Sequence, residues 1–194
     1  MVRKNVSQFV NSVIKKVWSE DIKKDYHNLN LLYECSLQQA FYHHIRRRLG
    51  DDFLNQHNIK LFPEYRIGDQ KADLAVVIID PNLAEENLLK DCVIEVISVI
   101  EMKYKGQFAS EDEFNKDVIK VLSYISESTP DTMYYLAFIR EKDFQPDDVV
   151  NWVTDEQSLE ANGQLTEMYS YIDMETNKMV WHLIEHKTSS SLLS

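Results

Sequence analysis

Apolar positions recur at helical spacing in the first quarter of the chain and again in its middle. Residues 8–24 place apolar side chains three and four positions apart, which predicts an amphipathic helix. Residues 31–49 repeat this pattern at four-residue steps, and Gly50 follows as a typical C-cap. Ser110 precedes Glu113 by three residues, which is the spacing of a capping box and predicts the start of another helix.

The rest of the pattern predicts mainly strands, because the apolar runs are short and rich in Val, Ile and aromatic residues. These runs are residues 60–67, 71–79, 92–104, 133–139, 165–172 and 179–184. Residues 68–70 read Gly-Asp-Gln and predict a hairpin turn between the first two strands. A further helix is predicted over residues 147–160. Helices and strands in this order predict an α/β (α+β) fold with a mixed central sheet flanked by helices.

A chain of 194 residues suits one domain with a genuine core. We expect a single domain over residues 1–194, in which residues 1–28 form an N-terminal helix appendage. Residues 31–139 form the core, and residues 147–186 add a C-terminal helix and hairpin. No apolar run reaches the roughly 20 residues of a membrane helix, and the N-terminus lacks the apolar block of a signal peptide. The expected location is therefore the cytoplasm.

The charge balance bears on possible partners. The net charge of −11 argues against a general affinity for nucleic acid, whose phosphates attract cations. The charge is unevenly spread, since residues 1–50 hold nine Lys or Arg against four Asp or Glu, a balance of +5. Residues 51–194 hold twelve against twenty-eight, a balance of −16. A surplus of carboxylates suits divalent cations as well as an acidic, solubilising surface.

Three charged side chains stand within the most apolar strands. Asp73 lies near the start of the strand at residues 71–79, and Glu101 and Lys103 lie near the end of the strand at residues 92–104. Because strand side chains alternate, Glu101 and Lys103 share one face. If the two strands are neighbours, both carboxylates can hold one Mg²⁺, which binds few carboxylates and completes its shell with water and phosphate oxygen. Such an ion activates water for phosphodiester cleavage, and Lys103 would stabilise the attacking hydroxide and the transition state.

A carboxylate on the preceding helix adds to this group. Glu34 precedes Leu37 by three residues on the same apolar stripe, and a carboxylate that faces a core needs a partner or a metal.

This arrangement resembles the PD-(D/E)XK nuclease superfamily, which has the restriction-endonuclease-like fold with core order αβββαβ. The resemblance covers residues 31–139. It implies that Asp73 is the motif aspartate, Glu101 the second acid and Lys103 the motif lysine, and that these three are catalytic. It implies Asp73, Glu101 and Glu34 as metal ligands. Second-tier candidates follow from their positions in the strand before Asp73 or on the helix after Lys103: Glu64, Lys116, Asp117 and Lys120.

The resemblance implies a Mg²⁺-dependent phosphodiester hydrolase, a DNA endonuclease or exonuclease acting through a metal-activated water, with Mn²⁺ as a substitute ion. Defence and repair are among the open roles. The alternative is a catalytically inactive protein of this fold that serves as a protein-interaction or regulatory module. DNA is the expected partner, no membrane is expected, and residues 8–24 offer an interface for a homodimer or a partner subunit.

Plainer explanations stand beside these. Glu101 and Lys103 could form a cross-strand ion pair at a sheet edge, and Glu34 could be a partly exposed salt-bridge residue. Residues 46–48 are three arginines in the last turn of their helix, where they either complement the helix dipole or contact phosphate.

Overall fold

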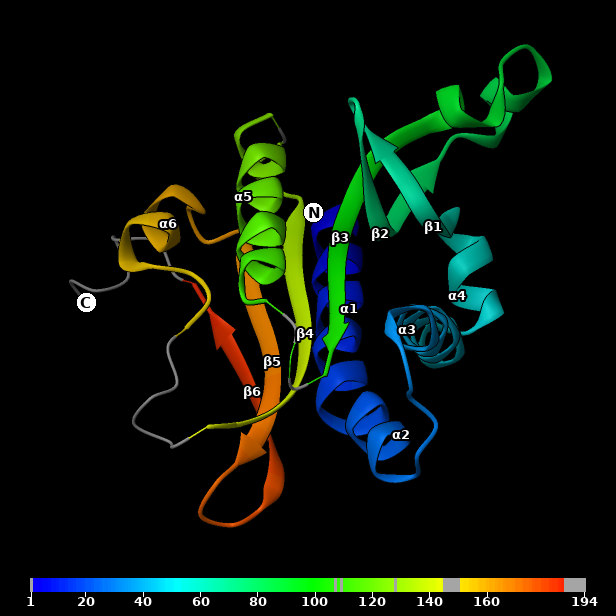
Figure 1. Ribbon diagram of the computed structural model, residues 1–194. Helices are drawn as coiled ribbons and strands as arrows, with labels where there is room; N and C mark the ends of the chain where they lie inside the picture. The colour runs from blue at the N-terminus through cyan, green and yellow to red at the C-terminus, as the bar shows by residue number, and fades with distance from the viewer. Residues whose placement is uncertain (1, 107, 109, 128, 145–150, 187–194) are drawn as a thin grey trace.

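The computed structural model describes residues 2–106, 108, 110–127, 129–144 and 151–186. Its centre is a six-stranded mixed sheet with strand order β1-β2-β3-β4-β5-β6 and helices on both faces (Figure 1). The strands are β1 (Ile59–Ile67), β2 (Gln70–Ile79), β3 (Val93–Lys105), β4 (Met133–Phe144), β5 (Leu165–Asp173) and β6 (Lys178–Glu185). β1, β2 and β3 run antiparallel, β3, β4 and β5 run parallel, and β6 is antiparallel to β5. The predicted mixed α/β class with a central sheet flanked by helices is confirmed.

The N-terminal helical segment is longer than the pattern predicts and includes a π-helical stretch. The helices are α1 (Val2–Lys16), the π-helix η1 (Val17–Ile22), α2 (Lys23–His27), α3 (Glu34–Leu49), α4 (Asp51–Gln56), α5 (Asp112–Glu127) and α6 (Asp155–Glu160). Two short 3₁₀ helices, η2 (Pro81–Glu85) and η3 (Leu89–Cys92), connect β2 to β3. The predicted helix at residues 147–160 is confirmed only over α6, and residues 147–150 lie outside the described residues.

The start of α5 differs in detail from the predicted capping box. The Ser110 hydroxyl accepts a hydrogen bond from the Asp112 amide at 3.1 Å, but Glu113 forms an ion pair with Lys105 instead. The apolar face of α5 is as predicted, because the residues expected to point inward are all buried: Phe114, Val118, Val121, Leu122 and Ile125.

The N-terminal helices cover one face of the sheet. Val10, Ile14 and Val17 belong to a core shared with α3 and with side chains of β2, β3 and β4. The apolar side of residues 8–24 is thus occupied within this chain. An interface with a second subunit through this helix stays a prediction, and it would have to use the polar side.

The arginines at the end of α3 pair with carboxylates of this chain. Arg46 pairs with Asp51 at 2.6 Å, and Arg47 pairs with Asp21 at 2.9 Å. Arg48 pairs with Asp21 as well. These contacts fasten α3 to its neighbouring helices and favour a structural role over contact with phosphate.

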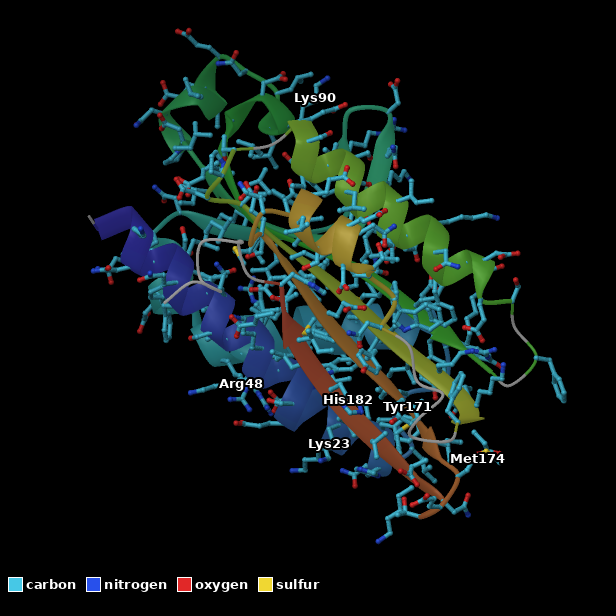
Figure 2. The ribbon with its side chains drawn as sticks, turned by 90° about the vertical axis from the view of Figure 1, so that its left-hand side faces the viewer. Lys23, Arg48, Lys90, Tyr171, Met174 and His182 are labelled. Carbon is cyan, nitrogen blue, oxygen red and sulfur yellow. The ribbon has the colours of Figure 1, made fainter. Side chains whose placement is uncertain are left out.

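No helix in the described part of the chain is both long and apolar enough to cross a lipid bilayer. Figure 2 labels Lys23 and Arg48 on the helices of the N-terminal layer and His182 on β6.

Trp18 joins this layer to β6. Its side chain is 1% exposed, its indole N–H donates to the His182 carbonyl at 3.0 Å, and its ring lies 4.9 Å from that of Trp181.

We expect Trp18→Ala to lower the free energy of unfolding by about 3–5 kcal/mol, as measured by chemical denaturation. Phe9→Ala on α1, where the residue is 44% exposed, is the control and should cost far less. Equal losses for the two variants would contradict this account of the core.

Candidate functional site

β2 and β3 separate in the middle of the sheet. Their pairing ends at Leu74 and Ile100, whereas β3 continues beside β4 as far as Lys105. The first residues of β2 continue beside β1 to the hairpin turn. The hairpin turn and the end of β3 therefore point in different directions (Figure 1). We call the point of separation the fork.

Asp73 stabilises the fork by replacing a missing strand partner. Its carboxylate accepts a hydrogen bond from the Met102 amide at 2.6 Å. On the other side, the Gln38 side-chain amide of α3 donates to the Asp73 carbonyl at 2.6 Å. Asp73 is thus held through both its side chain and its main chain.

Glu101 is the most deeply buried acid of the site, with 1% of its surface exposed. Its Oε2 accepts a hydrogen bond from Lys120 of α5 at 2.8 Å. Its Oε1 is buried and has no well-formed hydrogen bond within the described residues, although the Tyr124 hydroxyl lies beside the carboxylate, close enough for a weak one. A buried carboxylate oxygen without a good hydrogen bond is costly unless the group keeps a proton or binds an ion or a ligand.

Lys103 lies near the end of β3, beyond its pairing with β2, and connects α3 on one face of the sheet to α5 on the other. Its Nζ lies 3.3 Å from Glu34 Oε2 and 3.2 Å from Asp117 Oδ2. Burial lowers the pKa of Lys103, but the carboxylates of Asp117 and Glu34 more than offset it, so that the pKa lies above its usual value. Lys103 is therefore a cation at neutral pH and no general base.

These contacts decide between the plainer explanations. Glu101 and Lys103 pair with other residues and not with each other in the described contacts, so the cross-strand ion pair is wrong. Glu34 does not face the core as expected, because its side chain is 40% exposed and pairs with Lys103. Its position at the first turn of α3 places it on the rim of the site. Its role as a metal ligand stays a prediction.

The two fork carboxylates repel each other in a region with little solvent. Burial raises the pKa of Asp73 to about 6, with a further contribution from Glu34, against the opposing hydrogen bond from Met102. Burial and then the charge of Asp73 raise the pKa of Glu101 to about 8, although Lys120 opposes them. Strongly perturbed acids that lie close together are typical of functional sites.

The second-tier residues divide into two groups. Asp117 and Lys120 lie in the site, where they pair with Lys103 and Glu101. Lys116 is exposed on α5, and its charge acts on Glu113. Glu64 lies on the rim and pairs with Lys71 at 3.3 Å.

Glu64 also marks an irregular point in β1. The pairs on either side of it are Pro63 with Leu74 and Tyr65 with Ala72, so that Glu64 stands opposite Asp73. Its φ of 52° is in the left-handed region, where a non-glycine residue is strained by about 1–3 kcal/mol. Strain of this kind concentrates at functional sites, and here it lies directly beside the fork.

The sequence analysis missed two residues of the site, Gln38 and Tyr124. Gln38 follows Glu34 by four positions on α3, and Tyr124 follows Lys120 by four positions on α5. Helical spacing therefore places Gln38 on the same face of α3 as Glu34, and Tyr124 on the same face of α5 as Lys120. The Tyr124 hydroxyl is buried, and burial followed by the charge of Glu101 raises the pKa of Tyr124.

The site carries an excess of negative charge. Four carboxyl groups, those of Glu34, Asp73, Glu101 and Asp117, face the two lysines Lys103 and Lys120, which leaves two formal negative charges once all four, including Glu101, are ionised. Among the residues described, no three His, Cys, Asp or Glu side chains form a ready metal-binding group. The donors present fit a hard cation that takes two carboxylates and completes its shell with other oxygens.

No family model, no curated protein and no solved structure matches this chain.

The raised pKa of Glu101 predicts how stability depends on pH. In the unfolded chain this carboxyl ionises near 4.5, and in the folded protein near 8. Between these values the folded state retains a proton that the unfolded state has lost, so stability falls as the pH rises through this window. We expect the Tm of Glu101→Gln to fall less than that of the unmodified protein between about pH 5 and pH 8. At about pH 8 the Tm of Glu101→Gln should exceed that of the unmodified protein by about 2–4 °C for each kcal/mol of destabilisation that the substitution removes.

Thermal melts at several pH values measure this difference. Glu175→Gln, at an exposed turn, is the control and should follow the unmodified protein. Parallel pH profiles for Glu101→Gln and the unmodified protein would contradict the assignment.

Proposed function

We propose that the chain is a Mg²⁺-dependent phosphodiester hydrolase, a DNA endonuclease or exonuclease of the PD-(D/E)XK type. The observation that carries this proposal is the pair of carboxylates at the fork, half-buried Asp73 and buried Glu101, with the cation of Lys103 on the same face of β3 as Glu101. The order α3, β1, β2, β3, α5, β4 supports the restriction-endonuclease-like core in the proposal.

Asp73 and Glu101 would hold the ion, with Glu34 as a third candidate on the rim. The buried Oε1 of Glu101, which has no well-formed hydrogen bond, and the two excess negative charges of the ionised site support a divalent cation. Two protein carboxylates suit Mg²⁺, and Mn²⁺ has similar requirements. When bound, such an ion lowers the pKa of a water molecule and offsets the charge that develops on the phosphate.

The protein's own residues provide position and charge. The Met102 amide and the Gln38 side chain fix Asp73, so its carboxylate does not have to be ordered when substrate arrives. Glu34 and Asp117 hold Lys103 protonated and in place beside Glu101. A fixed cation at this point stabilises the negative phosphate oxygens of a transition state more than those of the ground state. The proposed reaction is a direct attack by water without a covalent intermediate.

A second candidate is an inactive module of the same fold that binds a protein. One observation favours this candidate: Lys103 and Lys120, the two lysines of the site, already pair with carboxylates of this chain. The balance of −16 after residue 50 would then serve contact with a basic partner.

Cleavage of DNA in the presence of Mg²⁺ separates the two candidates. We expect Asp73→Asn, Glu101→Gln and Lys103→Met each to reduce the rate of cleavage by at least about a hundredfold, because each removes a charge that acts on the reacting phosphate or its ion. Asp69→Asn, in the exposed hairpin turn, is the control and should keep full activity. Circular dichroism verifies that the variants are folded. Full activity in the three site variants, or no Mg²⁺-dependent cleavage by the unmodified protein, would contradict the proposal.

A further inference from the structure

A pocket of about 430 Å³ lies between the β1–β2 hairpin and the C-terminal end of α5. Both segments lie at the same end of the molecule in Figure 1. Tyr65 and Ile67 of β1 line one side, and Tyr124 of α5 and Tyr134 of β4 line another. Its size falls within the range of ligand sites, and its walls are aromatic and aliphatic, as is typical of such sites.

This pocket adjoins the fork. Tyr124 lines it, and the buried hydroxyl of the same residue lies beside Glu101. Along α5 the residues Asp117, Lys120 and Tyr124 follow one another on one face, so the helix leads from Lys103 past Glu101 to the pocket. A polymer bound at the fork would therefore extend toward the pocket.

Two cations stand at the pocket without a carboxylate partner. Arg66 and Lys90 are exposed and line it, and neither forms an ion pair in the part of the chain that the structure describes. Figure 2 shows Lys90 at the end of the molecule opposite Met174. Lys103 and Lys120 differ from them, because each is held by acids of the site. Arg66 and Lys90 are thus available for the phosphates of a ligand.

Two acids line the pocket as well, Glu95 and Glu127. They disfavour a ligand that is uniformly anionic. A nucleotide combines phosphate with a neutral base, and carboxylates accept hydrogen bonds from the exocyclic amino groups of bases. Aromatic walls, two exposed cations and two acids that can accept hydrogen bonds therefore match a base together with its phosphate.

We propose that this pocket holds an unpaired base of a nucleic acid strand whose neighbouring phosphate enters the fork, so that the substrate is single-stranded or has a single-stranded end. This inference rests on the proposed nuclease function. The half-buried ring of Tyr65 and the guanidinium of Arg66 offer surfaces for stacking, which all bases accept. A base paired inside a duplex cannot enter such a pocket unless it leaves the stack.

The test measures the binding of fluorescently labelled oligonucleotides by anisotropy, in an Asp73→Asn background that prevents cleavage. A short single strand is compared with a blunt duplex of the same sequence. We expect the single strand to bind at least about tenfold more tightly than the duplex, and Tyr65→Leu or Arg66→Ala to weaken single-strand binding about tenfold. Tyr65→Phe keeps the ring, and Lys178→Ala removes one exposed positive charge on β6, so both controls should bind as the background does.

The outcomes separate the pocket from the nuclease function. Equal or tighter binding of the duplex, or unchanged single-strand binding in Tyr65→Leu and Arg66→Ala, would overturn the pocket assignment. If the unmodified chain nevertheless cleaves blunt duplex in Mg²⁺, the nuclease function stands and only the pocket assignment fails. If the unmodified chain neither binds nor cleaves nucleic acid, both fail together.

Discussion

The hydrogen bond from the Met102 amide to the Asp73 carboxylate is the contact on which the site depends. Two strands that separate inside a sheet leave amides without partners, and a buried amide without a hydrogen bond costs about 1–3 kcal/mol. Asp73 supplies the missing acceptor from its own side chain. β2 can therefore leave β3 at this point, where acids of α3 and α5 pair with Lys103.

The same contact places a charge where the protein does not favour one. Asp73 and Glu101 are both poorly solvated, so burial raises the pKa of each, and the charge of Asp73 raises the pKa of Glu101 further. Lys103 and Lys120 reduce the repulsion without removing it, since two formal negative charges remain in the site once its four acids are ionised. A protein keeps an arrangement of this kind where function requires it, because neutral residues would be more stable there. The strained backbone of Glu64, opposite Asp73, fits the same explanation.

Much of this site could be predicted from the sequence, for physical reasons. A hairpin between β1 and β2 and a strand order that follows the chain bring Asp73 opposite the end of β3, and alternation places Glu101 and Lys103 on one face. Helical spacing separates Asp117 and Lys120, which face the sheet, from Lys116, which does not. The capped start of α5 and its buried stripe follow from local pattern as well.

Other features depend on tertiary contacts that no local pattern encodes. The exposure of Glu34 follows from where α3 begins, one turn later than the apolar spacing suggests. The choice of Lys120 rather than Lys103 as the partner of Glu101 depends on how α5 lies across the sheet. The short helix α4 has too few residues for a periodic signal.

The central claim is that the fork carboxylates form a site for a divalent cation. Calorimetric titration of the unmodified protein with Mn²⁺ at about pH 8, where Glu101 loses its proton, tests it most directly. We predict binding of Mn²⁺ to the unmodified protein and its loss in Asp73→Asn and in Glu101→Gln, with no loss in Asp69→Asn. No binding to the unmodified protein, or equal binding to all four proteins, would contradict the account.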